Sequence, residues 1–210
     1  MIKVERRKEP PKSLAIEKMK SQGKYNNFDV VEALNEDFEN KCYICGLKGL
    51  QEIEVEHLIP HYGDIDKKFD WNNLFLSCPH CNSVKNKKKY NTGIIDCCVS
   101  DPEERLLFHI YQNKVKVVAV NKDDVQAQLT ADLMYETFNV SNTGIRTITC
   151  KYRYNELLKQ MNLLYKVLEE KKNKPKSKVI DRKLNALLSR SSAFAEFKRC
   201  YYREHIGELL

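Results

Sequence analysis

The sequence predicts a mostly helical α+β protein with a small metal-stabilised β core. Three patterns support this class. Two Cys-x-x-Cys pairs bracket short strand-like runs within 41–98, β-rich runs flank 112–114, and apolar residues recur at helical spacing beyond 121. The predicted divisions are an N-terminal arm and helix at 1–40, a core at 41–98, and a hairpin with helices at 99–210. A single continuous domain is the alternative.

Composition favours a folded protein with a polyanionic partner. The chain has 210 residues and a hydrophobic fraction of 42%, with only 7 Gly and 6 Pro, which is typical of a globular chain rather than a disordered one. Lys and Arg outnumber Asp and Glu by 36 to 29, so the formal charge is +7. This balance suits nucleic acid, whose phosphates attract basic proteins through counterion release.

The sequence also predicts a cytoplasmic location without a membrane partner. No apolar run has the length needed to span a bilayer, and the charged start contains no apolar signal segment. Paired cysteines in a reducing compartment bind metal more often than they form disulfides, and this chain has 8 cysteines.

Local patterns predict the secondary structure. Pro10 and Pro11 exclude a helix at that point, so residues 1–13 are expected to form an extended arm that leads into a helical segment. The other expected elements are a helix over 29–40, strands at 53–55 and 74–76, a helix from Pro79 through Lys85, a hairpin of 106–111 with 115–120, and helices around 125–138, 157–168, 179–188 and 194–201.

Four cysteines form the strongest metal-binding pattern in the chain. They occur as two Cys-x-x-Cys pairs, Cys42 with Cys45 and Cys78 with Cys81. Each pair can bind a metal through two thiolates, and two pairs complete the tetrahedron of a structural Zn²⁺ site that has no open position for water. The sequence therefore predicts a structural zinc, with four metal-free buried cysteines as the alternative.

The remaining cysteines and histidines carry weaker signals. His80 lies inside the second pair, so it is either a ligand in place of a cysteine or an exposed histidine that faces phosphate. His109 and His205 have no ligand-like neighbours in the sequence and are expected to be structural. Small apolar core positions are expected for the other thiols: Cys97, Cys98, Cys150 and Cys200.

The segment between the cysteine pairs contains a set of residues suited to phosphodiester hydrolysis. The relevant runs are Val55-Glu56-His57-Leu58-Ile59-Pro60, Trp71-Asn72-Asn73-Leu74-Phe75-Leu76-Ser77-Cys78 and Cys81-Asn82-Ser83-Val84-Lys85. In order and spacing they resemble the zinc-containing branch of the HNH endonuclease family over residues 41–90. That resemblance implies a zinc-containing ββα-metal nuclease core. Glu56 and Asn82 stand where Asp and His are commoner, and both are variants that the family uses.

Each of these residues has an expected role. His57 is the candidate general base, because its ordinary pKa lies near neutrality. Glu56 and Asn82 are expected to bind a catalytic Mg²⁺ or Mn²⁺ through oxygen atoms. Asn73 resembles the family's central Asn, which implies a role in bracing the loop and orienting the histidine. Taken singly, these residues also fit a salt-bridged pair, a turn cap and an exposed helix position.

A cluster of lysines follows Asn82. Lys85, Lys87, Lys88 and Lys89 are expected to continue the helix, where they either contact phosphates beside the cut site or form a solvated face.

A wider resemblance covers the first two thirds of the chain. The runs that carry it, besides the two around Glu56 and Asn73, are Ile2-Lys3-Val4-Glu5-Arg6, Asp101-Pro102-Glu103-Glu104-Arg105-Leu106 and Phe108-His109-Ile110. Together they resemble the PtuB family, the HNH nuclease component of Septu anti-phage systems that is also found beside some retrons. The resemblance implies a PtuA-like ATPase partner of the ABC/SMC type.

These patterns leave several functions to compare. The leading hypothesis is a metal-dependent endonuclease that cuts phage DNA as the effector of a defence complex. The alternatives are an RNA nuclease acting on a substrate such as tRNA, a stand-alone restriction-type endonuclease, and a zinc-stabilised nucleic-acid-binding module without catalysis.

Overall fold

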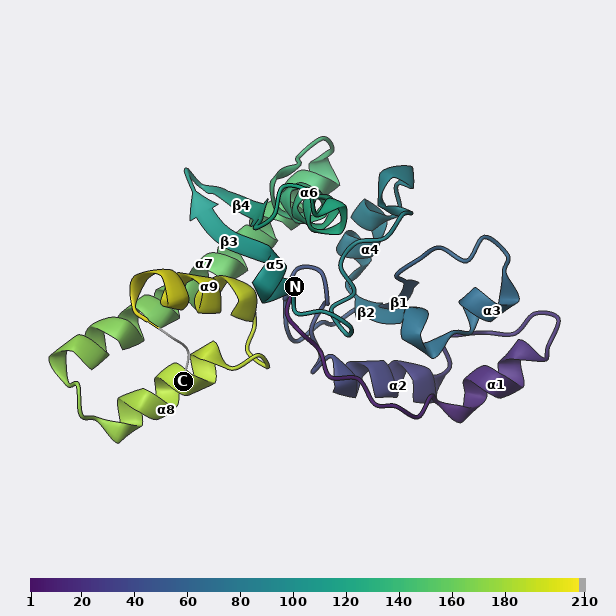
Figure 1. Cartoon of the computed structure of the whole chain (residues 1–210), viewed down its shortest axis with the longest axis horizontal. Coiled ribbons are helices and arrows are strands. Elements are labelled where there is room, and N and C mark those ends of the chain that lie inside the picture. Colours follow the sequence, from purple (N-terminus) through teal and green to yellow (C-terminus); the bar gives the residue numbers. More distant parts are fainter. Residues whose placement is uncertain (208–210) are drawn as a thin grey trace.

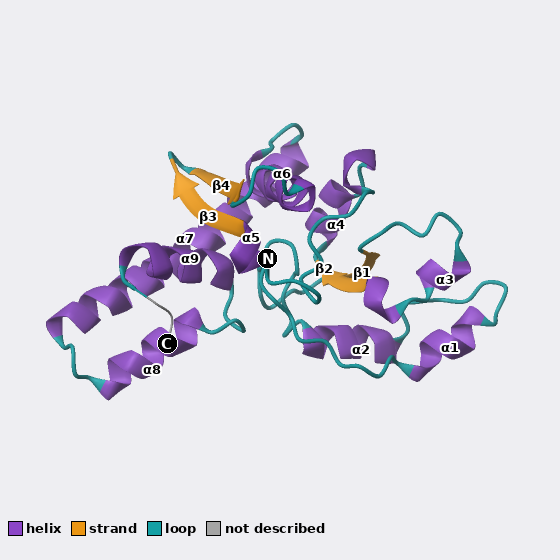
Figure 2. Cartoon of the chain, viewed as in Figure 1, coloured by secondary structure: helices purple, strands orange, loops and turns teal. Residues whose placement is uncertain are grey.

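Two small antiparallel sheets organise the chain, and helices surround both of them (Figure 2). The computed structural model describes residues 1–207. In chain order the elements are α1 (Lys12–Lys18), α2 (Phe28–Asp37), β1 (Glu54–His57), α3 (Ile65–Lys68), η1 (Trp71–Asn73), β2 (Leu74–Ser77), α4 (Pro79–Lys85), η2 (Lys88–Tyr90), α5 (Pro102–Arg105), β3 (Leu106–Tyr111), β4 (Lys114–Ala119), α6 (Val125–Asn139), α7 (Gly144–Asn173), α8 (Lys178–Leu188) and α9 (Ala195–His205).

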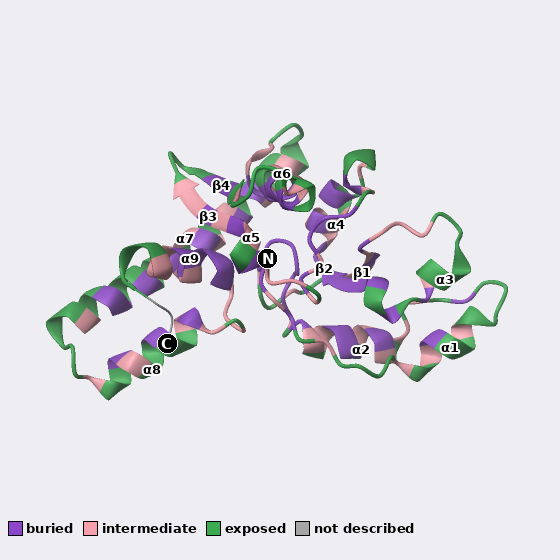
Figure 3. Ribbon diagram, in the orientation of Figure 1, coloured by how far each residue is buried: buried purple, intermediate pink, exposed green. Residues whose placement is uncertain are grey.

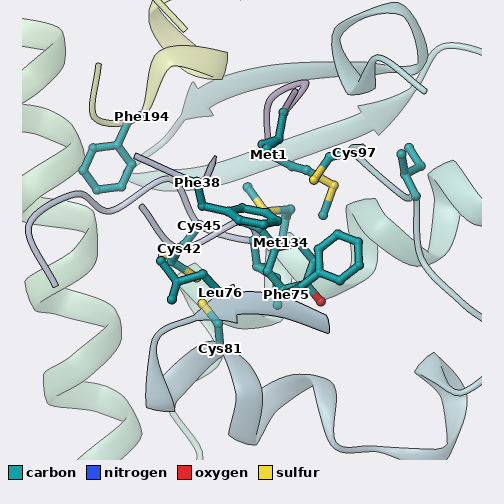
Figure 4. Packing of buried hydrophobic residues seen from close by; sticks show 14 of the residues in the cluster. Met1, Phe38, Cys42, Cys45, Phe75, Leu76, Cys81, Cys97, Met134 and Phe194 are labelled. Atoms are coloured by element: carbon teal, nitrogen blue, oxygen red, sulfur yellow. The ribbon is translucent and has the colours of Figure 1, made fainter. Parts of the chain in front are cut away.

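The first sheet pairs β1 with β2 and carries two of the predicted catalytic residues, Glu56 and His57. Glu56 pairs with Phe75, and His57 pairs with Leu74. All four residues of β2 are buried, because α2 packs against this strand and a cluster of aromatic rings surrounds it. The Phe75 ring lies 5.6 Å from the Phe38 ring (Figure 4) and 4.9 Å from the Tyr43 ring. The strand that pairs with β1 is therefore held on both faces.

The N-terminal arm secures the start of β2. Residues 1–10 contain no helix or strand, and the Val4 amide donates to the Cys97 carbonyl at 2.9 Å. The Arg6 guanidinium lies over the rings of Trp71 and Phe75, at 4.8 and 4.7 Å from their centroids, and donates to two backbone carbonyls of this segment. These cation–π contacts attach the arm to the segment that contains Asn73.

The second sheet pairs β3 with β4 and belongs to the helical part of the chain. Helix α6 packs against β4, and α9 packs against β3. The long helix α7 contacts α6, α8 and α9, so it connects the second sheet to the C-terminal helices (Figure 1). One cluster of buried hydrophobic residues extends from Met1 to Cys200 and includes side chains from both sheets. Figure 3 marks the buried positions along the ribbon, on strands of both sheets as well as on the helices.

Most of the predicted elements are present, with two corrections. Helix α7 begins at Gly144, well before the predicted 157, because the Thr143 side chain accepts a hydrogen bond from the Arg146 amide and caps a segment without a clear apolar period. Helix α4 ends at Lys85, so the prediction that the lysines continue this helix was wrong. Residues 88–90 form a separate 3₁₀ turn.

The helices of the described part of the chain are too short or too polar to cross a membrane. Among residues 1–207, no helix combines the length and the apolarity needed to cross a bilayer.

Candidate active site

The four cysteines of the two Cys-x-x-Cys pairs converge, as their spacing predicts. Their sulfur atoms all lie within 4.8 Å of one another, and all four residues are buried: Cys42, Cys45, Cys78 and Cys81. Gly46 follows the first pair with a φ of +73°, and a Cβ atom there would lie 2.5 Å from the Glu196 carboxylate, so the turn requires glycine. The cluster is compatible with a tetrahedral Zn²⁺ ion bound by four thiolates.

Arg153 provides a positive charge beside this cluster. Its Nη2 atom donates to Cys78 Sγ at 3.2 Å, and the side chain is buried. Hydrogen bonds from the other three thiols, followed by the charge of Arg153, lower the pKa of the Cys78 thiol. Arg153 therefore favours the thiolate form of Cys78, which is the form that binds metal.

His80 is neither the metal ligand nor the exposed, phosphate-facing histidine that the sequence analysis considered. Its Nε2 atom lies 3.0 Å from the Thr137 carbonyl, and its Nδ1 atom lies 3.0 Å from the Thr149 hydroxyl. Burial and the charge of Arg153 lower the pKa of His80 to about 4. The imidazole thus connects α4 to α6 and α7, and it is neither an exposed phosphate contact nor a member of the cysteine cluster.

His57 lies at the end of β1 with one ring nitrogen already committed. A carbonyl oxygen only accepts hydrogen bonds, so the contact of 3.0 Å between Nε2 and the Lys68 carbonyl requires Nε2 to carry the proton. In the neutral ring, Nδ1 then carries the lone pair. Burial lowers the pKa of His57 from its ordinary value, and the nearby charges of His61 and Lys85 lower it further. These contacts favour the neutral form of the ring.

Asn73 connects the two sides of the loop that follows β1. Its side-chain oxygen accepts from the Ile59 amide at 2.8 Å, and its Nδ2 atom donates to the carbonyls of Ile59 and Lys67 at 2.9 and 3.2 Å. Lys67 precedes Lys68, whose carbonyl binds His57. This geometry is what a bracing role requires, and the role itself stays a prediction.

Glu56 is a buried carboxylate beside His57. Tyr43 donates its hydroxyl to Oε1, and Lys85 Nζ lies 3.1 Å from Oε2. Burial raises the pKa of Glu56 to about 7, although the charge of Lys85 acts in the opposite direction. Each carboxylate oxygen has two lone-pair directions, so both oxygens of Glu56 can accept a further partner.

Asn82 makes a contact that the sequence analysis did not anticipate. Its Nδ2 atom donates to Glu54, two residues before Glu56 on β1. Residues two apart on a strand share a face, and α4 lies along that face, so Asn82 contacts Glu54 while Lys85 contacts Glu56. Because Nδ2 is engaged, the Asn82 Oδ1 atom is the one available to a cation. The period-2 position of Glu54 relative to Glu56 was the signal that would have identified it.

These residues offer a donor set that fits a hard divalent cation. Glu56 and Glu54 supply carboxylate oxygens and Asn82 supplies an amide oxygen, which are the ligand types that Mg²⁺ and Mn²⁺ prefer. Glu56, His57, Asn82 and Lys85 line one cavity of about 360 Å³. Tyr25, His61 and Tyr62 also line it, and the His61 ring lies 4.8 Å from the His57 ring.

The lysines that were predicted to contact nucleic acid do not form one exposed face. Lys85 is only 5% exposed, and its ammonium donates to the His57 carbonyl at 2.8 Å as well as contacting Glu56, so it does not belong to a solvated face. Lys87 forms an ion pair with Glu136 on α6, and Lys89 Nζ lies 2.7 Å from the same carboxylate. Lys88 is exposed. Contact between these lysines and nucleic acid stays a prediction.

Comparison with known proteins identifies this part of the chain. Residues 42–88 match the family model described as HNH endonuclease. The match begins at the first cysteine of the cluster, ends three residues after Lys85, and contains Glu56, His57, Asn73 and Asn82. It supports a nuclease, which is a phosphodiester hydrolase. No curated protein and no solved structure matches the chain significantly.

Proposed function

We propose that this chain is a metal-dependent HNH endonuclease that hydrolyses phosphodiester bonds of nucleic acid. The observation that carries the proposal is the placement of His57. Its Nε2 proton is bound to the Lys68 carbonyl, and its ring lines the same cavity as Glu56 and Asn82. A neutral imidazole in this position takes a proton from the attacking water at Nδ1.

Glu56 and Asn82 would hold the catalytic cation in this proposal. When bound, a divalent cation neutralises charge on the scissile phosphate and stabilises the leaving 3′ oxygen. The chain's own residues prepare the site. Lys85 keeps Glu56 partly ionised despite its burial, and Asn73 holds the loop that positions the Lys68 carbonyl and thereby His57. The four-cysteine cluster, with zinc bound, would hold α4 and β2 in register.

The proposed substrate is DNA, with RNA as the alternative. The net charge of +7 supports a polyanion without distinguishing the two, since hydrolysis of a phosphodiester does not depend on the sugar. The resemblance to the PtuB family supports phage DNA as the target and a defence role. It also supports an ABC/SMC-type ATPase partner that restrains or presents the nuclease.

A cleavage assay with the variant His57→Ala, and with His61→Ala as its control, tests the catalytic proposal. The full chain, alone and co-purified with the product of the neighbouring reading frame, is incubated with plasmid DNA and with structured RNA in Mg²⁺, with and without ATP. His57→Ala is expected to lose about 10²–10⁴ of the rate. In His61→Ala, which removes the neighbouring imidazole, the rate is expected to fall by less than about tenfold. Loss of the group that accepts the proton would cost more than this, and His61 is not that group in the proposal.

Two outcomes would contradict the proposal. If His57→Ala cleaved at the wild-type rate, His57 could not be the general base. If the chain and the complex both bound nucleic acid without cleaving it, a non-catalytic binding module would be favoured. Sequence-specific cutting by the isolated chain without ATP would instead favour a restriction-type enzyme.

A further inference from the structure

A second group of metal-binding side chains lies between β3 and α9, far from the cysteine cluster in sequence. His109 is on β3, while Cys200 and Glu204 are on α9. Their ligand atoms all lie within 4.8 Å of one another, and His109 Nε2 lies 3.5 Å from Glu204 Oε1. We propose that His109, Cys200 and Glu204 bind a second Zn²⁺ ion that joins the β3–β4 hairpin to the last helix.

The local structure explains why these residues meet. Cys200 and Glu204 are four residues apart, so they occupy one face of α9. That face covers the edge of β3 that is not paired with β4. The Phe108 amide on this edge donates to Cys200 Sγ at 3.3 Å, and the Phe108 ring lies 5.5 Å from the ring of Phe197, one turn earlier on α9. The adjacent His109 is thereby placed beside Glu204.

The donor set favours zinc over magnesium. Thiolate and imidazole are the ligands that Zn²⁺ binds well, and a carboxylate oxygen completes a common three-ligand set. Bond lengths of about 2.0–2.3 Å place tetrahedral ligands roughly 3.3–3.8 Å apart, so ligand atoms within 4.8 Å need to move by about 1 Å or less. Side-chain rotation alone allows such a movement for the two partly exposed members, His109 at 37% and Glu204 at 31%.

Cys200 is prepared for this role by its backbone contact. The residue is 1% exposed, so its side chain is held in place by the surrounding core. The Phe108 amide donates to its Sγ atom at 3.3 Å and fixes the sulfur beside β3. Backbone amide donation of this kind leaves the sulfur lone pairs on the other side available to a metal.

The fourth ligand position has two natural occupants. His109 and Glu204 line a cavity of about 210 Å³, and His205 lines it as well. The His205 ring stacks on Tyr201 at 4.3 Å, and its Nδ1 atom donates to the Tyr201 carbonyl at 3.0 Å, so Nε2 carries the lone pair in the neutral ring. Water or His205 therefore completes the tetrahedron. His109, which showed no ligand-like neighbours in the sequence, acquires them only in the folded chain.

Zinc stoichiometry of the full chain tests the proposal independently of nuclease activity. The protein is expressed with added zinc, desalted and analysed by elemental mass spectrometry. The wild type is expected to contain two zinc ions per chain, and His109→Ala and Glu204→Ala one each. Cys98→Ser removes a thiol that belongs to neither cluster and is expected to keep both ions. Glu204 is partly exposed, so its loss is expected to leave the fold intact, which circular dichroism checks.

The expected and contradicting results are distinct. A fall from two ions to one in Glu204→Ala, with the wild-type spectrum retained, supports the second site. A wild type that contains a single zinc, or two zinc ions retained in both His109→Ala and Glu204→Ala, overturns it. Substitution with Co²⁺ gives a second readout, since the mixed His, Cys and Glu site adds a visible spectrum that these two variants lose while the four-thiolate spectrum remains.

Discussion

The Nη2 atom of Arg153 lies 3.2 Å from the Sγ atom of Cys78, although 75 residues separate the two along the chain. Arg153 is on α7, in the helical part of the protein, and Cys78 precedes α4 in the HNH segment. The contact places a buried guanidinium from outside the matched segment against the cysteine cluster. The helical region therefore contributes directly to the environment of the proposed zinc.

Replacing Arg153 is expected to weaken zinc retention. Arg153→Met removes the positive charge and the hydrogen bond to Cys78, and loss of a group that supports metal ligands typically costs about 10–100-fold in affinity. Competition with a chromophoric chelator measures this change. Lys151→Met, an exposed position on the same helix, is the matched control and is expected to bind zinc like the wild type. Equal zinc affinity in both variants would contradict the role of Arg153.

Asn73→Ala is expected to lower the turnover rate more than substrate affinity. The substitution removes three hydrogen bonds to the loop that carries the Lys68 carbonyl, so the His57 ring loses its fixed orientation. Loss of these bonds is also expected to cost about 1–3 kcal/mol of unfolding free energy. Steady-state kinetics and denaturant unfolding measure the two effects. Asn72→Ala, at the exposed neighbouring position, is expected to change neither.

The pH dependence of cleavage is expected to report the lowered pKa of His57. The base acts only when Nδ1 is unprotonated, and burial lowers the pKa of His57 below its ordinary 6.5. At a divalent cation concentration that saturates Glu56, whose own pKa is about 7, activity should therefore be retained at pH 6.5 and above and should decline only as the pH falls through the lower pKa of His57. A profile of kcat/KM from about pH 5 to about pH 9 measures this limb. If the activity declined well above pH 6.5, and did so in His57→Ala as well, the decline would have to be assigned to a group other than His57.

Lys85→Met is expected to destabilise the protein more at alkaline than at acidic pH. Removing one partner of a buried ion pair costs about 3–5 kcal/mol while the other partner stays charged. The pKa of Glu56 is raised to about 7, so the folded state holds a proton there that the unfolded chain releases. Below this pH, protonated Glu56 needs no countercharge, and the cost falls.

Denaturant unfolding near pH 5 and near pH 8.5, without added divalent cation, compares these two conditions for Lys85→Met. The double variant Lys85→Met with Glu56→Gln leaves no buried charge at this pair, so it is expected to recover most of the lost unfolding free energy. A loss of equal size at both pH values would show that packing of the lysine, rather than its charge, stabilises this part of the chain.

Lys198 is expected to make the unfolding free energy rise as the pH increases above about 8. The residue is buried on α9, and burial lowers its pKa from 10.5 to about 8. The unfolded chain therefore binds the proton more tightly, so the unfolding free energy should rise as the pH increases from about 8 to about 10.5, by about 3 kcal/mol at most. Lys198→Met should remove this rise. An identical pH dependence in both proteins would show that the Lys198 pKa is not lowered.

Short-range patterns in the sequence determined much of the protein. Local patterns were Pro79 at the first position of α4, the β-rich runs 106–111 and 115–120, and the helical periods of α6, α8 and α9. Each depends on neighbouring residues, so these patterns predict local structure well. The cysteine pairs are also local, since two thiols three positions apart bind one ion wherever the pair is placed. The order of the residues from Glu56 to Asn82 likewise identified the HNH segment.

The tertiary structure alone decided which distant side chains meet. The contacts of Arg153 with Cys78, of Asn82 with Glu54 and of His109 with Cys200 and Glu204 join elements whose relative placement follows from burial of one shared core. The same placement buries Lys85, whose sequence context alone suggests a surface position. Hydrophobic burial is non-directional, so local periodicity shows which face of an element is covered without showing which element covers it.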